Sequence, residues 1–113
     1  MEDSTHTFST LPIVGKVMSE VVRSYESVRF VASDGQKWLM EHETECCEEV
    51  YIEDINGNLS DLVGTPILVA EVASADDGWA FYRFSTIKGD VSIRWNGHSE
   101  SGCYSLEVKF VAL

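Results

Sequence analysis

Proline, cysteine and basic side chains are all scarce in this sequence. Its 113 residues include only 2 Pro, 3 Cys and 8 Lys or Arg, against 19 Asp or Glu. The few prolines, together with a hydrophobic content of 44%, exclude a disordered or low-complexity chain. An odd number of cysteines in a chain with this much hydrophobic material indicates reduced thiols rather than a disulfide framework. The length leaves room for one domain with one modest core.

Long apolar runs are also missing from the sequence. No segment approaches the ~18 apolar residues that a transmembrane helix needs, and the polar, acidic start lacks the basic and apolar regions of a signal peptide. We therefore expect a cytoplasmic protein without membrane contact. We also expect a flexible N-terminal segment over residues 1–12 and a single β-rich domain over residues 13–113.

The negative charge is concentrated in the middle of the chain. No Lys or Arg lies between Trp38 and Tyr82, a stretch with eleven of the 19 carboxylates, while the remaining eight are balanced by eight basic residues. The whole formal net charge of −11 therefore originates in this stretch. A surface of this sign repels nucleic acid and anionic membranes, so we expect a partner with a basic surface and no direct nucleic-acid binding.

Short segments rich in β-branched and aromatic residues, broken by turn signals, extend along most of the chain. This pattern is typical of a mainly β, antiparallel domain, in the form of a twisted sheet or a barrel-like meander of seven to eight strands. A short helical turn is expected near residues 59–63, where Gly64 can close it in the left-handed conformation. The expected strands cover residues 17–23, 27–32, 36–42, 50–55, 67–73, 79–87, 91–95 and 104–112.

Two of these strands, and the turns, have the clearest patterns. Apolar residues fall on alternate positions in Val91–Trp95 and in Tyr104–Ala112, so each of these strands is expected to bury one face. Ser33-Asp34-Gly35 and Lys88-Gly89-Asp90 supply tight-turn residues, some of which tolerate a positive φ. The polar stretch 96–102 is expected as a longer loop.

Glutamates dominate the segment from Glu41 onward. On an extended backbone, residues two apart project to one side at a spacing of about 6.6 to 6.8 Å, so Glu41, Glu43 and Glu45 form a row of carboxylates. Such a row is consistent with a solvated edge strand that resists aggregation, or with a surface that binds a basic partner. The candidate partner-binding residues are Glu41, Glu43, Glu45, Glu48, Glu49 and Glu53.

Catalysis finds little support in the sequence. Glu48, Glu49, Glu53 and Asp54 could be nominated as acid–base pairs, but nothing identifies a nucleophile or a substrate cradle beside them. Asp54 is expected on the same face as Ile52, as a buried carboxylate that caps the turn after it. We expect no enzymatic activity and no cofactor.

The same acidic segment contains His42, Cys46 and Cys47, which suggest a metal site. Zinc prefers four such ligands in a tetrahedral array, and His98 or Cys103 could complete the set. However, adjacent cysteines on an extended backbone point to opposite faces and cannot easily bind one ion. The alternative is that one thiol is a small buried hydrophobic group and the other marks a bulge or the start of a strand.

Two arginines lie in strands that are rich in aromatic residues. Arg83 follows Tyr82 and Arg94 precedes Trp95, with His98 in the polar stretch beyond. These five residues could bind a nucleotide-type ligand, with rings stacked on a base and a guanidinium group on a phosphate. Alternatively, the rings pack in the core and the arginines pair with surface acids across strands.

A set of short motifs extends over residues 15–104. Its members are Cys46-Cys47-Glu48, Ile52-Glu53-Asp54-Ile55, Gly57, Asp61-Leu62, Gly64, Pro66-Ile67, Phe81-Tyr82, Thr86, Lys88-Gly89, Ile93-Arg94-Trp95, Gly97 and Tyr104-Ser105. In these motifs the sequence resembles a small domain family of unknown function that is met mainly in phage and prophage genomes. One departure is Glu100, where a smaller polar residue is expected. The resemblance implies no catalytic residue or cofactor, and it implies a compact protein that acts on host machinery or on a host signal.

These observations lead to one functional hypothesis and two alternatives. We expect a non-enzymatic phage-type protein in the host cytoplasm that inhibits or sequesters a host component, such as a defence or regulatory factor, through its acidic surface. The first alternative is a module that sequesters a nucleotide-type signal. The second is a metal-stabilised module that uses His42, Cys46 and Cys47.

Overall fold

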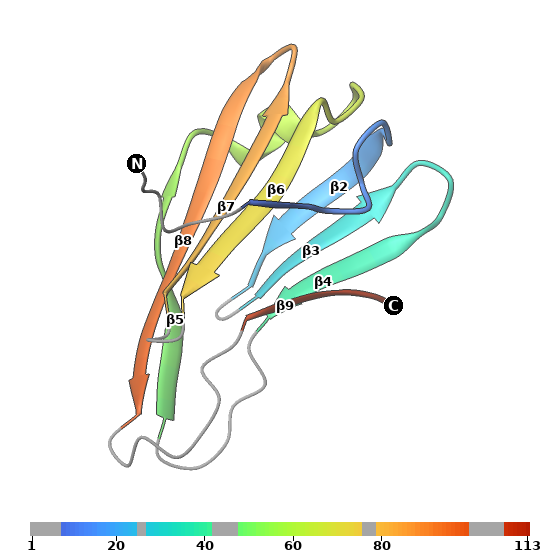
Figure 1. The fold of residues 1–113 in the computed structure, drawn as a ribbon. Helices are drawn as coiled ribbons and strands as arrows, with labels where there is room; N and C mark the ends of the chain where they lie inside the picture. Colours follow the sequence, from blue (N-terminus) through green and yellow to red (C-terminus); the bar gives the residue numbers. More distant parts are fainter. Residues whose placement is uncertain (1–7, 25–26, 42–47, 76–78, 100–107) are drawn as a thin grey trace.

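The computed structural model describes residues 8–24, 27–41, 48–75, 79–99 and 108–113. Within these residues the chain forms nine β-strands and one short 3₁₀ helix, arranged as two antiparallel sheets (Figure 1). The prediction of a mainly β, antiparallel fold is therefore confirmed. Eight of the nine strands overlap strands expected from the sequence, and the helix falls on the expected helical turn.

The larger sheet has five strands in the order β1-β6-β7-β8-β5, and each neighbouring pair is antiparallel. Three strands that are consecutive in the chain form its centre, while β5 lies at one edge and the short β1 at the other. The strands are β1 (Ser9–Thr10), β5 (Glu48–Asn56), β6 (Val69–Ala75), β7 (Trp79–Thr86) and β8 (Gly89–Ser99).

The smaller sheet has the order β2-β3-β4-β9, so the C-terminal strand completes a sheet that the N-terminal half of the chain begins. Two isolated bridges connect it to the segment before β6: Val17 pairs with Pro66, and Met18 pairs with Val63. Its strands are β2 (Met18–Arg23), β3 (Ser27–Ala32), β4 (Lys37–Glu41) and β9 (Lys109–Ala112).

The core lies between the two sheets and is largely aromatic at its centre. The ring of Phe30, from β3, lies 5.2 Å from that of Phe84 on β7 and 5.4 Å from that of Phe110 on β9, measured between centroids. Trp95 is completely buried, and its indole Nε1 donates to Met40 Sδ at 3.2 Å, which connects β8 to β4. These contacts join residues far apart in the chain, so the sheets stabilise each other.

The helix η1 (Leu59–Leu62) closes one end of the core. Asn58 caps it by accepting a hydrogen bond from the Ser60 backbone N–H, and Leu62 is completely buried. The end of β7 holds η1 from the other side, because the Thr86 hydroxyl donates to the Asp61 carbonyl at 2.5 Å. This arrangement fixes the segment between β5 and β6 against the larger sheet.

Part of the segment 1–12, which was expected to be flexible, forms a short strand. Ser9 and Thr10 form β1, which pairs with Val72 and Glu71 of β6, and Leu11 is only 8% exposed. The pairing gains backbone hydrogen bonds for β1, and Leu11 enters the core beyond it. Sheet structure therefore begins at Ser9, residues 1–7 lie outside the described part of the chain, and the flexibility expected for this segment stays a prediction.

The hairpin between β7 and β8 also differs from the expectation. Its turn residues are Ile87 and Lys88, and Gly89 already pairs with Thr86 as the first residue of β8. At the other end, residues 96–99 continue β8 instead of starting a loop. Each of them pairs with a residue of β5, a partner that local sequence patterns cannot reveal.

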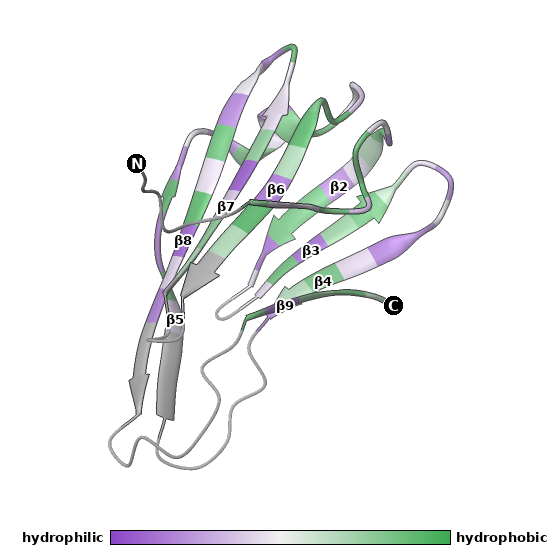
Figure 2. Ribbon diagram, viewed as in Figure 1, coloured by the Kyte–Doolittle hydropathy of each residue, from purple (hydrophilic) through white to green (hydrophobic). Residues whose placement is uncertain are grey.

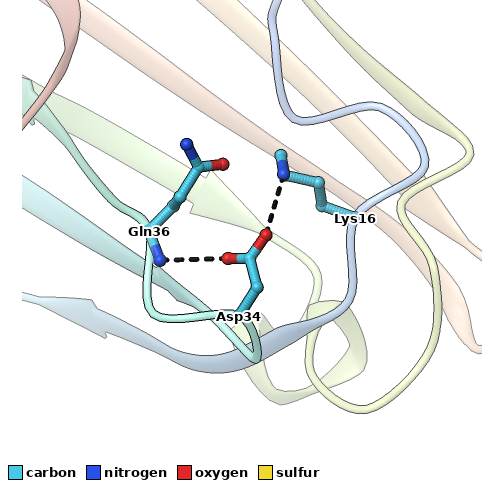
Figure 3. Close-up of polar contacts among 3 residues, drawn as sticks. All are labelled: Lys16, Asp34 and Gln36. Carbon is cyan, nitrogen blue, oxygen red and sulfur yellow. Dashed lines mark hydrogen bonds and ion pairs between the residues drawn. The ribbon is translucent and has the colours of Figure 1, made fainter.

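The turn between β3 and β4 forms at the predicted Ser33-Asp34-Gly35 (Figure 3). The Gln36 backbone N–H donates to the Asp34 carboxylate at 3.0 Å, and Lys16 Nζ forms an ion pair with it, also at 3.0 Å. These two contacts, the first being the larger effect, hold the pKa of Asp34 below its usual value. Gly35 adopts φ +93°, as the turn requires.

Candidate functional site

The outer face of the five-stranded sheet, which points away from the core, has several charged and polar side chains. Alternation along β7 places Phe81, Arg83 and Ser85 on this face, while Tyr82 and Phe84 are buried on the other. Figure 2 shows hydrophobic and hydrophilic residues alternating along β7 and β8. The arginines of these strands, Arg83 and Arg94, are therefore exposed to solvent on the outer face.

A pocket of about 460 Å³ lies on this outer face. Strand register brings its lining together, because Arg83 is directly opposite Ser92, and Ser92 is directly opposite Asn56. A neighbouring row runs from Val69 through Ser85 to Asp90. The pocket is lined by Asn56, Gly57, Val69, Phe81, Arg83, Ser85, Asp90, Val91 and Ser92.

Arg83 is the basic residue among the described residues that line the pocket, and two neighbours orient it. Its guanidinium group forms an ion pair with Glu71 on β6, and its Cζ atom lies 5.1 Å from the ring centroid of Phe8. The Phe8 ring in turn meets Phe81 edge-on, with 6.5 Å between centroids. A carboxylate on one side and an aromatic face on the other limit the rotamers available to this side chain.

Arg94 lies on the same face, opposite Phe81 in the register. Its partner is Asp54, at 4.0 Å, and both side chains are more than 40% exposed. Asp54 was expected to be buried with Ile52, and this expectation is wrong. A β-bulge between Ile52 and Asp54 inserts Glu53 as an extra residue and turns Asp54 to the outer face, where Asn56 Nδ2 also donates to it at 3.1 Å.

The edge of the pocket depends on Gly57, where the chain leaves β5. Gly57 has φ +98°, and its Cα packs directly against the β8 backbone at Asp90 and Val91. A Cβ atom here would lie 3.1 Å from the Val91 Cα and still closer to the Asp90 carbonyl oxygen. Only glycine therefore allows this close approach between the loop and β8.

The structure separates the aromatic residues proposed as ligand contacts from the arginines. Tyr82 is 1% exposed and Trp95 is completely buried, so both rings belong to the core. Adjacent residues in a strand point to opposite faces, which is why Tyr82 cannot share a site with Arg83. In the structure these two rings pack in the core, and both arginines form ion pairs with acids on neighbouring strands. His98 lies in β8 opposite Glu49 in the register, but its side chain is outside the described part of the structure.

Phe81, Asn56, Asp90 and Ser92 are pocket residues that sequence reasoning did not single out. The signal that finds Phe81 is the alternation itself, since Phe81 is two positions from Arg83 on the same strand. The other three come from β8 and from the end of β5, and their approach depends on strand order. No local pattern in the sequence contains that information.

The acidic residues proposed for partner binding are divided between the two sheets. Glu41 is half-buried on β4, opposite Lys109 of β9, whereas Glu53 is exposed on β5. Glu48 and Glu49 are the first two residues of β5. Glu43 and Glu45 lie outside the described residues, so the expected row of three carboxylates stays a prediction.

The metal hypothesis rests on His42, Cys46 and Cys47, which also lie outside the described residues. Elsewhere, over the residues whose positions are described, no group of three His, Cys, Asp or Glu side chains is close enough to hold a metal ion.

The edges of the two sheets differ in length and charge. The edge strand β5 has nine residues, whereas the edge strands β1, β2 and β9 have two, six and four. β5 also has four acidic residues and no basic residue, while β2 has one of each sign and β9 has a single Lys. No described strand pairs with the side of β5 that faces away from β8. The acidic residues of β5 are Glu48, Glu49, Glu53 and Asp54.

Residues 11–110 match the protein family described as Domain of unknown function (DUF7448). The chain belongs to this family. The DUF7448 match begins at the buried Leu11 and extends into β9, so it includes nearly all of both sheets, the pocket and the β5 edge. No curated protein and no solved structure matches the chain. Among the described residues, no helix has the length and apolar character of a membrane-spanning segment.

Proposed function

We propose that this DUF7448 protein is a non-enzymatic binding protein that docks a basic, extended segment of its partner along the side of β5 with which no described strand pairs. The observation that carries the proposal is that β5 is both the longest described edge strand and the most acidic one. Length supplies backbone groups for pairing, and charge selects the partner. Binding in this mode is stoichiometric and needs no catalytic group.

The backbone of β5 supports strand addition. Every edge strand presents a row of N–H and C=O groups on its unpaired side, and an extended peptide can satisfy them by adding a strand to the sheet. Nine residues of β5 offer enough length for several such hydrogen bonds. The bulge at Glu53 interrupts the regular register, so it would divide the docked segment into two parts.

The charge of β5 favours a basic segment over other occupants. Glu53 is exposed and has no hydrogen bond or ion pair with another described residue, and Asp54 remains 41% exposed beside Arg94. A second copy of the same acidic strand would be repelled, because like charges on neighbouring strands are destabilising. Lys and Arg side chains of a partner would instead meet carboxylates along the edge.

The biological setting of the proposal comes from the resemblance to phage and prophage domains. In that setting the partner is a host protein, such as a defence or regulatory factor, and docking inhibits it by sequestration in the host cytoplasm. The acidic net charge of −11 supports fast association with a basic surface through electrostatic steering.

The test is co-purification from host-cell lysate with a matched pair of charge-reversal variants. Glu53→Lys reverses a carboxylate on the β5 edge, and Glu20→Lys makes the same change in net charge on the β2 edge of the other sheet. The proposal expects a stoichiometric partner that the wild type and Glu20→Lys retain, that Glu53→Lys loses, and that high salt releases. Equal retention by both variants, or retention that does not respond to salt, would contradict it.

A further inference from the structure

We propose that the pocket on the outer face receives the side chain of one Arg or Lys residue of the basic segment that docks on β5. This inference rests on the proposed function, and it names the group of the partner that the protein recognises. The pocket adjoins the docking strand, because Asn56 is the last residue of β5 and Gly57 follows it directly. Three observations lead to the inference: the order of the charges across the sheet, the acceptors at the β5 end of the pocket, and the distance from β5 to Asp90.

The order of the charges favours a cation at the β5 end of the pocket. Arg83 is on β7, and its guanidinium group contacts Glu71 on β6 and the ring of Phe8, which precedes β1. In the sheet order, β6 and β1 lie on the side of β7 that is remote from β8 and β5. The guanidinium group is therefore turned away from β5, and the carboxylate of Glu71 offsets its charge. The charged side chain of the described lining that remains toward β5 is Asp90, on β8.

Asp90 has acceptor capacity left for such a cation. Its Oδ1 atom accepts a hydrogen bond from the Ser85 hydroxyl at 2.6 Å, and Asp90 has no ion pair with another described residue. Lys88, its nearest basic neighbour in the sequence, donates instead to the Val63 carbonyl at 2.6 Å. A carboxylate has about four lone-pair sites, so Asp90 can bind an ammonium or guanidinium group while it keeps its bond to Ser85.

Two neutral acceptors lie beside Asp90. The amide Nδ2 of Asn56 donates to Asp54 at 3.1 Å, so the amide oxygen of Asn56 stays available as an acceptor. Ser92 lies directly opposite Asn56 and two positions from Asp90 on the same strand, so its hydroxyl is on the same face. An ammonium group has three N–H donors and a guanidinium group has five, and both need several oxygen acceptors of this kind.

The dimensions of the sheet suit a side chain that enters from the side of β5. Neighbouring strands lie about 4.8 Å apart, so a segment paired with β5 would run about 10 Å from β8. An extended Lys side chain covers about 6 Å from Cα to Nζ, since its five bonds of about 1.5 Å follow a zigzag, and an Arg side chain is slightly longer. The Asp90 side chain and one hydrogen bond of about 2.9 Å cover the rest. Gly57, which packs against the backbone of Asp90, has no side chain that could stand between the two.

An NMR titration of the isotope-labelled protein tests the pocket by itself. The probes are the N-acetyl methylamides of arginine and lysine, with that of citrulline as the uncharged analogue of arginine. We expect a basic probe to shift the amide signals of Asn56, Gly57 and Asp90 with a millimolar Kd, and the citrulline probe to bind about threefold to tenfold more weakly. Asp90→Asn should weaken the basic probe by a similar factor. The matched control Asp34→Asn removes the same charge from an exposed turn of the other sheet, and it should leave binding unchanged.

Two further variants keep the test decisive. Arg83→Gln should leave the binding of the basic probe unchanged or strengthen it, because a charge of the same sign leaves the pocket, and a loss of binding in this variant would overturn the inferred order of charges. Ser92→Val serves if Asp90→Asn fails to fold. Valine suits a β-strand and removes one acceptor while it fills the pocket, so we expect weaker binding with an unchanged melting temperature.

Co-purification separates this inference from the docking proposal. If both are correct, Glu53→Lys and Asp90→Asn each reduce the capture of the partner. Loss of capture by Glu53→Lys with full retention by Asp90→Asn would leave docking on β5 standing and overturn the role of the pocket. That role is also overturned if neither basic probe binds, if citrulline binds as tightly, or if Asp90→Asn binds like Asp34→Asn. Equal capture by Glu53→Lys and Glu20→Lys would instead overturn the docking proposal, whatever the probes show.

Discussion

Replacing Gly57 with alanine tests the close approach of the loop after β5 to β8, and Gly35→Ala is a matched control. Both glycines have a positive φ, +98° at Gly57 and +93° at Gly35, so the backbone strain imposed by a side chain is nearly the same. That strain is of the order of 1 to 2 kcal/mol for a non-glycine residue. The two positions differ in their surroundings.

A Cβ atom at Gly35 meets nothing within 4 Å, whereas at Gly57 it meets the Asp90 carbonyl oxygen and the Val91 backbone. These atoms belong to a paired strand and cannot move without disturbing it. We therefore expect Gly35→Ala to lower the free energy of unfolding by about 1 to 2 kcal/mol from strain alone. Gly57→Ala should lower it by a further 1 to 3 kcal/mol or so, which is the usual cost of overpacking.

Urea unfolding of the two variants and the wild type, followed by tryptophan fluorescence, measures the difference between them. Because the strain is shared, the excess for Gly57→Ala reports the contact with β8. Equal destabilisation of the two variants would show that the loop does not lie against β8 as described, and it would remove the support for one edge of the pocket.

Three further predictions concern the core, the η1 contact and the β3–β4 turn. Phe30→Ala should lower the free energy of unfolding in urea by about 3 to 5 kcal/mol, because Phe30 is completely buried between the sheets. Phe8→Ala on the outer face should lower it by about 1 kcal/mol or less. Similar losses for the two variants would contradict the two-sheet core. Thr86→Val should lower the free energy of unfolding by about 1 to 3 kcal/mol, because the Asp61 carbonyl loses its hydrogen-bond donor. An unchanged free energy of unfolding would show that this hydrogen bond does not hold η1 in place. Because the pKa of Asp34 is lowered in the folded protein, its carboxylate stabilises the fold fully at a pH above the pKa of Asp34 in the unfolded chain, which is about 3.9. This stabilisation disappears as the pH falls through the lower pKa of Asp34 in the folded protein. Wild type should thus unfold at a higher temperature than Asp34→Asn at pH 7, with the gap closing in acid, and a gap independent of pH would refute the assignment.

Local chemistry explains which parts of the fold the sequence could predict. Strands such as β3 and β8 follow from alternation between apolar and polar residues, and the turn at Asp34 and Gly35 follows from residues that tolerate its geometry. The helix η1 was expected from the short segment before Gly64. Each of these signals lies within a few neighbouring residues.

Pairing between distant segments explains what could not be predicted. Residues 96–99 look polar and loop-like, and they become strand because β5 lies beside them. Asp54 changes face because of the bulge at Glu53, which adds a residue that no pattern announces. The division of the strands into two sheets likewise depends on contacts such as that between Trp95 and Met40, 55 positions apart in the sequence.

The candidate site was only partly predictable for a related reason. Arg83 and Arg94, proposed as phosphate-binding groups, lie on the outer face, but the rings proposed with them, Tyr82 and Trp95, are adjacent in sequence and therefore face the core. Applying the two-residue period strictly would have selected Phe81 instead. The contribution of Asn56 and Asp90 needs the strand order of the larger sheet, which only the structure supplies.

Amide hydrogen exchange of the protein with and without its captured partner tests the central claim most directly. If the partner adds a strand to β5, amides of β5 that face away from β8 should exchange much more slowly in the complex, while amides on the outer sides of the described edge strands β2 and β9 should exchange as before. Protection at β2 or β9 with unchanged exchange at β5 would contradict the account.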